Sequence, residues 1–170
     1  LKEGAFFDPT NFTFPSGVHI CEVEIDPETG TTRIDRWTAV DDFGTLINPM
    51  IVEGQVHGGI AQGVGQALWE VVAYDPGSGQ LISGSFMDYV MPRADDLPRF
   101  EIATNGVPTA RNPLGVKGAG EAGTVGAVAC LTSAVLDALA PLGVTDLPTP
   151  FTPQRLWQAI QEAMKGAPAR

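Results

Sequence analysis

The sequence predicts an α+β fold in which antiparallel β-hairpins pack against about three helices. Two turns, at residues 26–30 and 74–79, have the Asp-Pro and Gly spacing of β-hairpins and are flanked by strand-like residues. Three segments have apolar residues at helical spacing, starting near residues 49, 124 and 154. With 170 residues, of which 44% are hydrophobic and 18% charged, the chain has enough apolar sequence for one globular core.

The charge balance and the cysteine content exclude several classes of protein. The formal net charge of -10 disfavours binding of nucleic acid or of an anionic membrane through a basic patch. No apolar run is expected to span a bilayer and no signal peptide is visible, so the sequence predicts a cytoplasmic protein without a membrane partner. Cys21 and Cys130 lie in apolar runs, which favours buried free thiols over a disulfide, and two cysteines are too few for an iron–sulfur cluster.

The first element is a β-hairpin, predicted from alternating apolar residues on both sides of a turn. One strand is expected over residues 18–25, with a bulge between Ile20 and Cys21 where the alternation shifts. The turn at 26–30 leads into a second strand over residues 32–40. This hairpin is expected to begin the sheet.

A long helix is predicted over residues 49–71, because Asn48 is a favourable N-cap and Pro49 suits the first helical position. Its apolar side comprises Val52, Val56, Ile60, Val64 and Leu68. Its opposite side carries Gln55, Gln62 and Gln66. Such amides can bind a polar heterocycle, and the many glycines between them indicate a closely packed body, either a ligand or another helix or sheet. His57 falls on the apolar side and is predicted to be a hydrogen-bonded core histidine.

The remaining elements are predicted from periodicity and turn residues. Strand-like residues occupy 80–91, a polar loop covers 92–98, and a short strand is expected at 100–103. A helix over 124–140 and a last helix over 154–164 complete the fold. The buried side of the last helix is predicted to comprise Leu156, Trp157, Ile160 and Met164.

A glycine-rich loop at residues 115–126 is the strongest candidate for a functional site. It contains five glycines in twelve residues and a single carboxylate, Glu121. The glycines let the backbone approach another body, against which Glu121 can act as a base. Alternatively, Glu121 simply stabilises the start of the following helix. Residues 118–123 also match G-x-G-x-x-G, but they follow turn residues instead of a strand, and a carboxylate would repel a pyrophosphate, which disfavours dinucleotide binding.

Three segments share a further pattern: GQVHGGIAQGVGQAL at residues 54–68, GSFMDYVMP at 84–92 and NPLGVKGAGEAGTVG at 112–126. In order and spacing they resemble the C-terminal part of the large subunit of molybdenum hydroxylases, the family of xanthine dehydrogenase, aldehyde oxidase and aerobic carbon monoxide dehydrogenase. The resemblance implies that residues 16–164 form part of a larger molybdopterin-binding domain. Residues 1–15 are then a lead-in from a missing upstream domain, and residues 165–170 a frayed tail.

The resemblance also implies roles for individual residues. Glu121 matches the family's catalytic glutamate, a general base, and Gln62 matches a glutamine that hydrogen-bonds the pterin. The implied cofactor-binding set comprises Gln62, Gln55, Gln66, Gly118, Ala119 and Gly120. Lys117 and the N-terminus of the following helix are expected to keep Glu121 ionised. The family's metal is held by the pterin dithiolene, so no protein metal ligand is assigned.

As a function, the resemblance implies hydroxylation of an aldehyde, an N-heterocycle or a similar carbon centre with water by a molybdopterin-dependent oxidoreductase. The implied cofactor is molybdopterin in a cytosine dinucleotide form, with iron–sulfur clusters and FAD on other domains or subunits. The implied partners are the upstream half of the molybdenum subunit, the iron–sulfur and flavin subunits and a small-molecule substrate, and this part alone is expected to be inactive. Two alternatives remain: a cofactor-free interaction module with the same fold, and an anion- or nucleotide-binding domain that uses the glycine loop.

Overall fold

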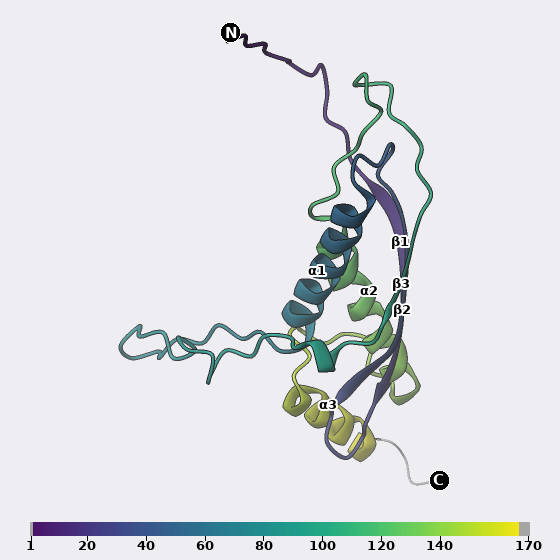
Figure 1. The fold of residues 1–170 in the computed structure, drawn as a ribbon. Coiled ribbons are helices and arrows are strands. Elements are labelled where there is room, and N and C mark those ends of the chain that lie inside the picture. Colours follow the sequence, from purple (N-terminus) through teal and green to yellow (C-terminus); the bar gives the residue numbers. More distant parts are fainter. Residues whose placement is uncertain (1, 167–170) are drawn as a thin grey trace.

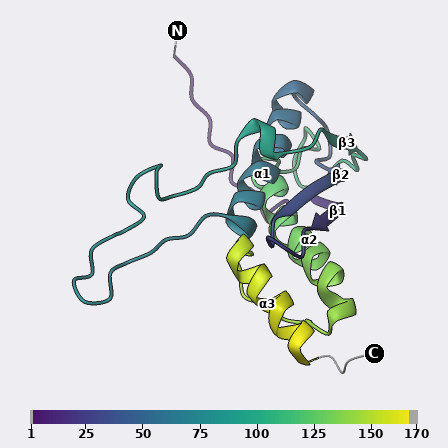
Figure 2. The same ribbon diagram turned by 90° about the horizontal axis from the view of Figure 1, so that it is seen from below.

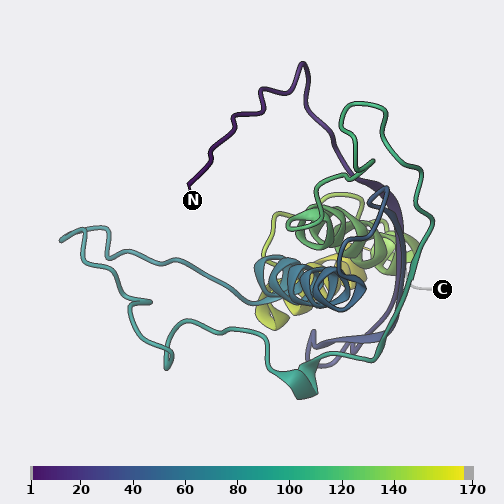
Figure 3. The ribbon, with the colours of Figure 1, turned by 45° about the horizontal axis from the view of Figure 1, so that its top comes forward.

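The structure is a computed structural model that describes residues 2–166. Three strands form one curved sheet, and the helices gather on one side of it (Figures 1 and 3). The strands are β1 (Ser16–Ile25), β2 (Thr32–Asp42) and β3 (Phe100–Thr104), and the helices are α1 (Pro49–Leu68), α2 (Ala122–Leu139) and α3 (Pro153–Gly166). The sheet order is β1-β2-β3. This arrangement confirms the predicted α+β fold.

The sheet combines a hairpin with a crossover. β1 and β2 are antiparallel, as predicted, whereas β3 pairs with β2 in parallel, so the sheet is mixed. The register shifts between Glu22 and Val23, so the bulge predicted between Ile20 and Cys21 is wrong by two residues. Burial alternates regularly along β1 through the predicted position, and nothing there forces an extra residue into the strand. The turn of the hairpin lies against α3, because a Cβ on Gly30 (φ 74°) would be 2.7 Å from the backbone N of Trp157.

α1 begins as the sequence predicts and ends earlier. The side chain of Asn48 accepts the N–H of Ile51 at 3.2 Å, which is N-cap geometry. The helix stops short of the predicted end because the next two N–H groups both bond to the carbonyl of Gly65, at 2.9 and 2.8 Å. Its buried side comprises Val56, Ile60, Val64 and Leu68, with Val52 half-buried. The side chain of His57 is 43% exposed beside the ring of Phe100, so the predicted core histidine is wrong.

Two glycines of α1 let α2 approach closely. A Cβ on Gly59 would lie 2.8 Å from the backbone N of Thr124, and one on Gly63 would lie 2.6 Å from the Cβ of Ala127. The hydroxyl of Thr124 donates to the carbonyl of Gly59 at 3.1 Å across the same contact. For these two glycines the closely packed body is therefore another helix. A Cβ on Gly58 would meet nothing within 4 Å, so crowding does not explain that glycine.

α2 is the central helix of the fold and also its most apolar one. It packs against α1 and β1, and its buried residues include Leu131, Val135 and Leu139. By length and composition, the 21 residues from Ala122 to Leu142 would suffice to cross a membrane, so the prediction that no run is long enough is wrong on those two criteria. Only 22% of the apolar window is buried here, which leaves a large apolar side of α2 uncovered.

Residues 70–92, which we call the arm, run out from the body as a long loop (Figures 1 and 2). The predicted turn forms, with the N–H of Gly79 bonded to the carbonyl of Asp75 at 2.9 Å. The strand predicted over 80–91 does not form, because the two sides of the arm are joined only near the turn, by the bridge between Tyr74 and Leu81 and by neighbouring bonds such as that from the N–H of Ile82 to the carbonyl of Ala73 at 2.8 Å. Among the exposed apolar residues of the arm are Val72, Ile82, Phe86, Met87 and Val90. A short 3-10 turn (Ala94–Asp96) then leads to β3.

α3 is joined to the end of α1. The N–H of Phe151 donates to the carbonyl of Ala67 at 2.7 Å, directly before α3 begins. Leu156 and Ile160 are buried as predicted, whereas Trp157 and Met164 are 42% and 59% exposed. The predicted buried side is therefore wrong for those two residues. α3 includes residues 165 and 166, and residues 167–170 of the predicted tail lie outside the described residues.

Candidate active site

The glycine loop is held in place at its beginning by the end of β2. The N–H of Thr45 donates to the carbonyl of Gly115 at 3.0 Å, and the N–H of Lys117 donates to the carbonyl of Phe43 at 2.9 Å. The amide of Asn112 bonds both the N–H and the carbonyl of Val116, at 3.1 and 2.9 Å. These bonds fix the backbone just before residues 118–121. The loop therefore presents those four residues from a rigid base.

Lys117 is committed to a partner other than Glu121. Its ammonium lies 2.5 Å from Oδ2 of Asp42, and both side chains are about five-sixths buried. The hydrogen bond from Lys117, together with the N–H groups of Val107 and Gly44, lowers the pKa of Asp42 to about 2. The expectation that Lys117 keeps Glu121 ionised is therefore wrong.

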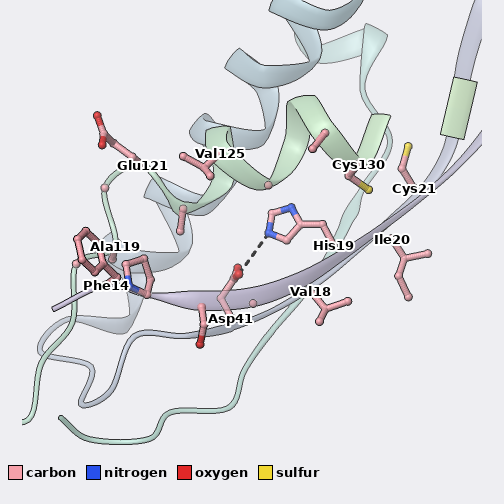
Figure 4. A pocket seen from close by; sticks show the side chains of 18 of the residues that line it. Phe14, Val18, His19, Ile20, Cys21, Asp41, Ala119, Glu121, Val125 and Cys130 are labelled. Carbon is pink, nitrogen blue, oxygen red and sulfur yellow. Dashed lines mark hydrogen bonds and ion pairs between the residues drawn. The ribbon is translucent and has the colours of Figure 1, made fainter. Parts of the chain in front are cut away.

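Glu121 stands at the N-cap of α2, and its side chain makes no capping hydrogen bond. Its carbonyl accepts the N–H of Val125 at 3.0 Å, so the backbone alone begins the helix. The carboxylate is exposed and points away from the floor of the neighbouring groove (Figure 4). Hydrogen-bonded capping therefore does not account for this side chain, which stays available for chemistry with a group outside the described residues.

The structure brings one of the predicted glutamines to the loop. Oε1 of Gln55 lies 4.0 Å from the position that a Cβ on Gly120 would take, so the first turns of α1 adjoin the loop. Gln62 and Gln66 lie on the same exposed side of α1, about 10 and 16 Å further along its axis. The predicted row of glutamines on α1 is thus present, but only Gln55 lies beside the glycine loop.

Residues 118–120 are open to the outside. A Cβ on Gly118 would have only Cδ of Pro15 nearby, at 4.0 Å, and Gly120 has only the amide of Gln55 at the same distance. Ala119 is half-buried against the core. Nothing in the described chain requires the small residues at 118 and 120, so their space suits a body from elsewhere. β3 ends at Thr104 and turns follow it, so no described strand leads directly into G-x-G-x-x-G and the dinucleotide context is missing.

A groove of about 1250 Å³ runs from this loop along β1 and α2 (Figure 4). Its floor holds a pair that the sequence did not reveal: Nε2 of His19 lies 3.3 Å from Oδ1 of Asp41, and both side chains are at least 96% buried. His19 Nδ1 and Asp41 Oδ2 are buried without a hydrogen-bond partner among residues 2–166. A Cβ on Gly126 would be 2.8 Å from the ring of His19, so glycine is needed where α2 crosses the pair.

Cys21 and Cys130 face the same groove as free thiols, which confirms that they do not form a disulfide. Both are half-buried instead of fully buried. Burial, followed by the nearby Cys130 and Glu22, raises the pKa of Cys21 to about 12, and burial also raises the pKa of Cys130. Among residues 2–166 no three His, Cys, Asp or Glu side chains are arranged to hold a metal ion.

Comparison with known proteins identifies the family of this chain. The sequence model of the molybdopterin cofactor-binding domain matches residues 1–98. The chain belongs to this family. The glycine loop and α2 follow the matched residues in the chain.

The relatives of this molybdopterin cofactor-binding domain are molybdenum hydroxylases. It is 42% identical over 162 residues to the carbon monoxide dehydrogenase large chain of Hydrogenophaga pseudoflava, covering 95% of this chain and 20% of that one. It superposes on reconstituted CO dehydrogenase from Oligotropha carboxidovorans with a TM-score of 0.91 and 38% identity, covering 96% and 20% of the two chains. Against quinoline 2-oxidoreductase from Pseudomonas putida 86 the TM-score is 0.79 with 48% identity, covering 82% and 18%.

These findings confirm the resemblance stated from the sequence. The similarity to the carbon monoxide dehydrogenase large chain covers 95% of the chain, well beyond the 98 residues of the family match. The chain spans about a fifth of the length of the curated relatives it matches.

Proposed function

We propose that this molybdopterin cofactor-binding domain forms one wall of the cofactor site of a molybdopterin-dependent oxidoreductase and supplies its general base, Glu121. The observation that carries the proposal is the uncommitted carboxylate of Glu121 at the start of α2, next to an open glycine loop. Gln55 supports it by joining the amide side of α1 to that loop. Loop, base and amide thus meet on one surface of the molecule.

The described residues fit molybdopterin by their shape and their hydrogen-bonding groups. Gly118 and Gly120 leave open space where a large planar group can come close to the backbone. The exposed amides of Gln55, Gln62 and Gln66 offer both donors and acceptors to a pterin. When bound, the cofactor supplies the redox centre that takes up electrons from the substrate. We assign the cofactor contacts to these five residues and to Ala119, and we assign no metal ligand.

Glu121 performs the proton transfer in this proposal. Its carboxylate removes a proton from the water-derived nucleophile that attacks an electron-poor carbon of the substrate. The backbone bonds around residues 115–117 hold the loop still, so the base keeps its position between turnovers.

The substrate in this proposal is an aldehyde, an N-heterocycle or a similar small molecule. Its support is the range of the relatives, which include a nicotine 6-hydroxylase large subunit and a quinoline 2-oxidoreductase. We further propose that the upstream half of the molybdenum subunit completes the site. Iron–sulfur clusters and FAD lie on other domains or subunits, the molybdopterin is a cytosine dinucleotide, and the enzyme is cytoplasmic.

Replacement of Glu121 in the intact molybdenum subunit tests the proposal. We expect Glu121→Gln to lower kcat at least ~100-fold, because general-base catalysis contributes about 10²–10⁴-fold. Molybdenum content, measured by metal analysis, is expected to stay the same because the side chain does not hold the cofactor. Glu28→Gln, on the exposed hairpin turn, is the matched control and should keep full activity. Full activity of Glu121→Gln would refute the assignment.

A further inference from the structure

We propose that the groove between β1 and α2 receives one extended segment of the molybdenum subunit from outside these 170 residues, added as a strand along the free edge of β1. The inference rests on the proposed function insofar as it treats the chain as part of a larger subunit. Beyond that function, the proposal concerns the surface between β1 and α2 and the strand that covers it.

The edge of β1 is the first observation. β1 has ten residues, pairs only with β2 and lies at the outside of the sheet, so its outer N–H and C=O groups have no strand beside them among residues 2–166. Strands of this length are longer than the usual five to six residues. Its sequence contains no proline, and the only charged residues in it are Glu22 and Glu24, near one end. An edge of this kind is a template for another strand.

The wall opposite the edge has the right shape for such a strand. The side of α2 that lines the groove has small residues at Ala129, Ser133 and Ala134, which leave room beneath the helix. Val125, at the end near the glycine loop, is 74% exposed. A strand added to β1 would lie under this side of α2 and cover it. Much of the apolar surface that α2 leaves open would then be buried.

The floor of the groove offers a polar anchor. Asp41 is 2% exposed, and its Oδ2 lacks a donor among residues 2–166, as does the ring nitrogen Nδ1 of His19. A buried polar atom without a partner costs free energy, which a donor from the added segment would recover. Both residues line the groove, so the segment is the body positioned to supply that donor.

Beyond the glycine loop, the charge of the groove favours a polypeptide over the cofactor as its occupant. Outside residues 118–121 its carboxylates are those of Asp41 and Asp137, and none of its lining residues is Lys or Arg. A phosphate-bearing group would be repelled there, whereas a segment carrying Lys or Arg near Asp137 would be attracted. The curated relatives have about four-fifths of their length outside the region that this chain covers, which supplies the polypeptide.

Thiol labelling tests whether the groove is covered. Ser133→Cys places a reporter on the exposed wall of the groove, and Gln158→Cys on exposed α3 is the matched control. Maleimide labelling, mapped by mass spectrometry, is compared between the 170-residue chain and the intact subunit. We expect Ser133→Cys to react at least ~10-fold more slowly in the intact subunit, and Gln158→Cys at the same rate in both. Equal rates for Ser133→Cys would overturn the inference.

Amide hydrogen exchange tests whether the occupant is a strand. In the intact subunit, peptides covering β1 are expected to exchange at least ~10-fold more slowly than in the 170-residue chain, because the outer N–H groups gain partners. Peptides covering residues 37–41 of β2, which already pair on both sides, should change little. Unchanged exchange in β1 would refute a strand even if the groove were shielded. Metal analysis of the same samples separates the two proposals. A shielded groove in a subunit without molybdenum would contradict the proposed function alone. An open groove in a subunit that contains molybdenum would contradict this inference alone.

Discussion

Asp42 shows how one side chain can fix the position of the glycine loop. Its Oδ1 accepts the N–H groups of Gly44 and Val107 at 2.8 and 2.9 Å, while Oδ2 takes the ammonium of Lys117. These bonds join the end of β2, the segment after β3 and the glycine loop. The acid therefore holds together three stretches of chain that are far apart in sequence.

The lowered pKa of Asp42 predicts a dependence of stability on pH. The pKa is about 2 in the folded protein and about 4 in an unfolded chain, so the stabilisation is complete above pH ~4 and is lost as the pH falls towards 2. We expect Asp42→Asn to be less stable than the wild type at pH 7 and to lose less between pH 4 and 2. Urea unfolding of the full chain at several pH values measures this.

Asp95→Asn is the control for that experiment, because Asp95 is an exposed residue of the short 3-10 turn. It should leave the pH profile unchanged. An Asp42→Asn profile parallel to that of the wild type would show that the three donors do not act through this carboxylate.

The exposed glutamines of α1 give a second prediction at the residue scale. If their amides hold the pterin, Gln55→Ala combined with Gln62→Ala leaves polar groups of the cofactor without hydrogen-bonding partners. The molybdenum content of the intact subunit should then fall several-fold. The helix itself should be unaffected, since both side chains are exposed and alanine favours helix. Gln158→Ala on α3 is the control. Full molybdenum content in the double variant would argue against contacts between these glutamines and the cofactor.

The paired residues of the site show where sequence reasoning stops. Glu121 and the glutamines were predicted because each lies in a local motif. His19 and Asp41 are 22 positions apart and meet only through the register of β1 and β2. The alternation of β1 places His19 on its inner face, which was the one available signal. Lys117 and Asp42, 75 positions apart, offered no local signal at all.

At the scale of elements, the contact between α1 and α2 depends on two glycines. Gly59→Ala would place a methyl group 2.8 Å from a backbone N of α2, which cannot move without shifting the helix. We expect a loss of about 1–3 kcal/mol in the free energy of unfolding, the usual cost of overpacking. Gly58→Ala is its immediate neighbour and meets nothing within 4 Å, so it should gain about 0.5–1 kcal/mol. Urea denaturation compares the two, and a stabilised Gly59→Ala would contradict the packing described.

Elements with local signals were predicted well. The first turn, the N-cap at Asn48 and the periodic stretches of α2 and α3 formed near their predicted places. The parallel pairing of β3 was missed because it depends on a crossover of more than fifty residues. The strand predicted at 80–91 failed for a related reason: strand-like residues form a strand only where a ladder of paired residues supports them, and the arm has just the bridge between Tyr74 and Leu81 and the bonds beside it.

The whole molecule has a well-packed core beside unusually large uncovered apolar surfaces. Phe151 is 1% exposed, whereas Phe86 and Met87 on the arm are 83% and 91% exposed. Phe12 and Phe14, before β1, are also largely exposed. Exposed apolar surfaces of this kind are typical of contact sites for other proteins, membranes or ligands.

This contrast predicts opposite effects of similar substitutions. Phe86→Ala combined with Met87→Ala should change the free energy of unfolding of the full chain by less than about 0.5 kcal/mol, since neither side chain packs on the core. Phe151→Ala should cost about 3–5 kcal/mol. Binding of a hydrophobic dye to the folded chain should fall in the double variant. A large loss of stability there would show that the arm packs on the body in solution.

The arm has a consequence for how this fold tolerates change. It is inserted between α1 and β3, whose positions are set by the body of the molecule and not by the loop that joins them. Additional residues at its tip, around Gly77, would lengthen the loop and leave the end of α1 and the start of β3 in place. The tip is accordingly the natural place to graft a foreign epitope or a fluorescent reporter, and the place where length variation among related chains costs least.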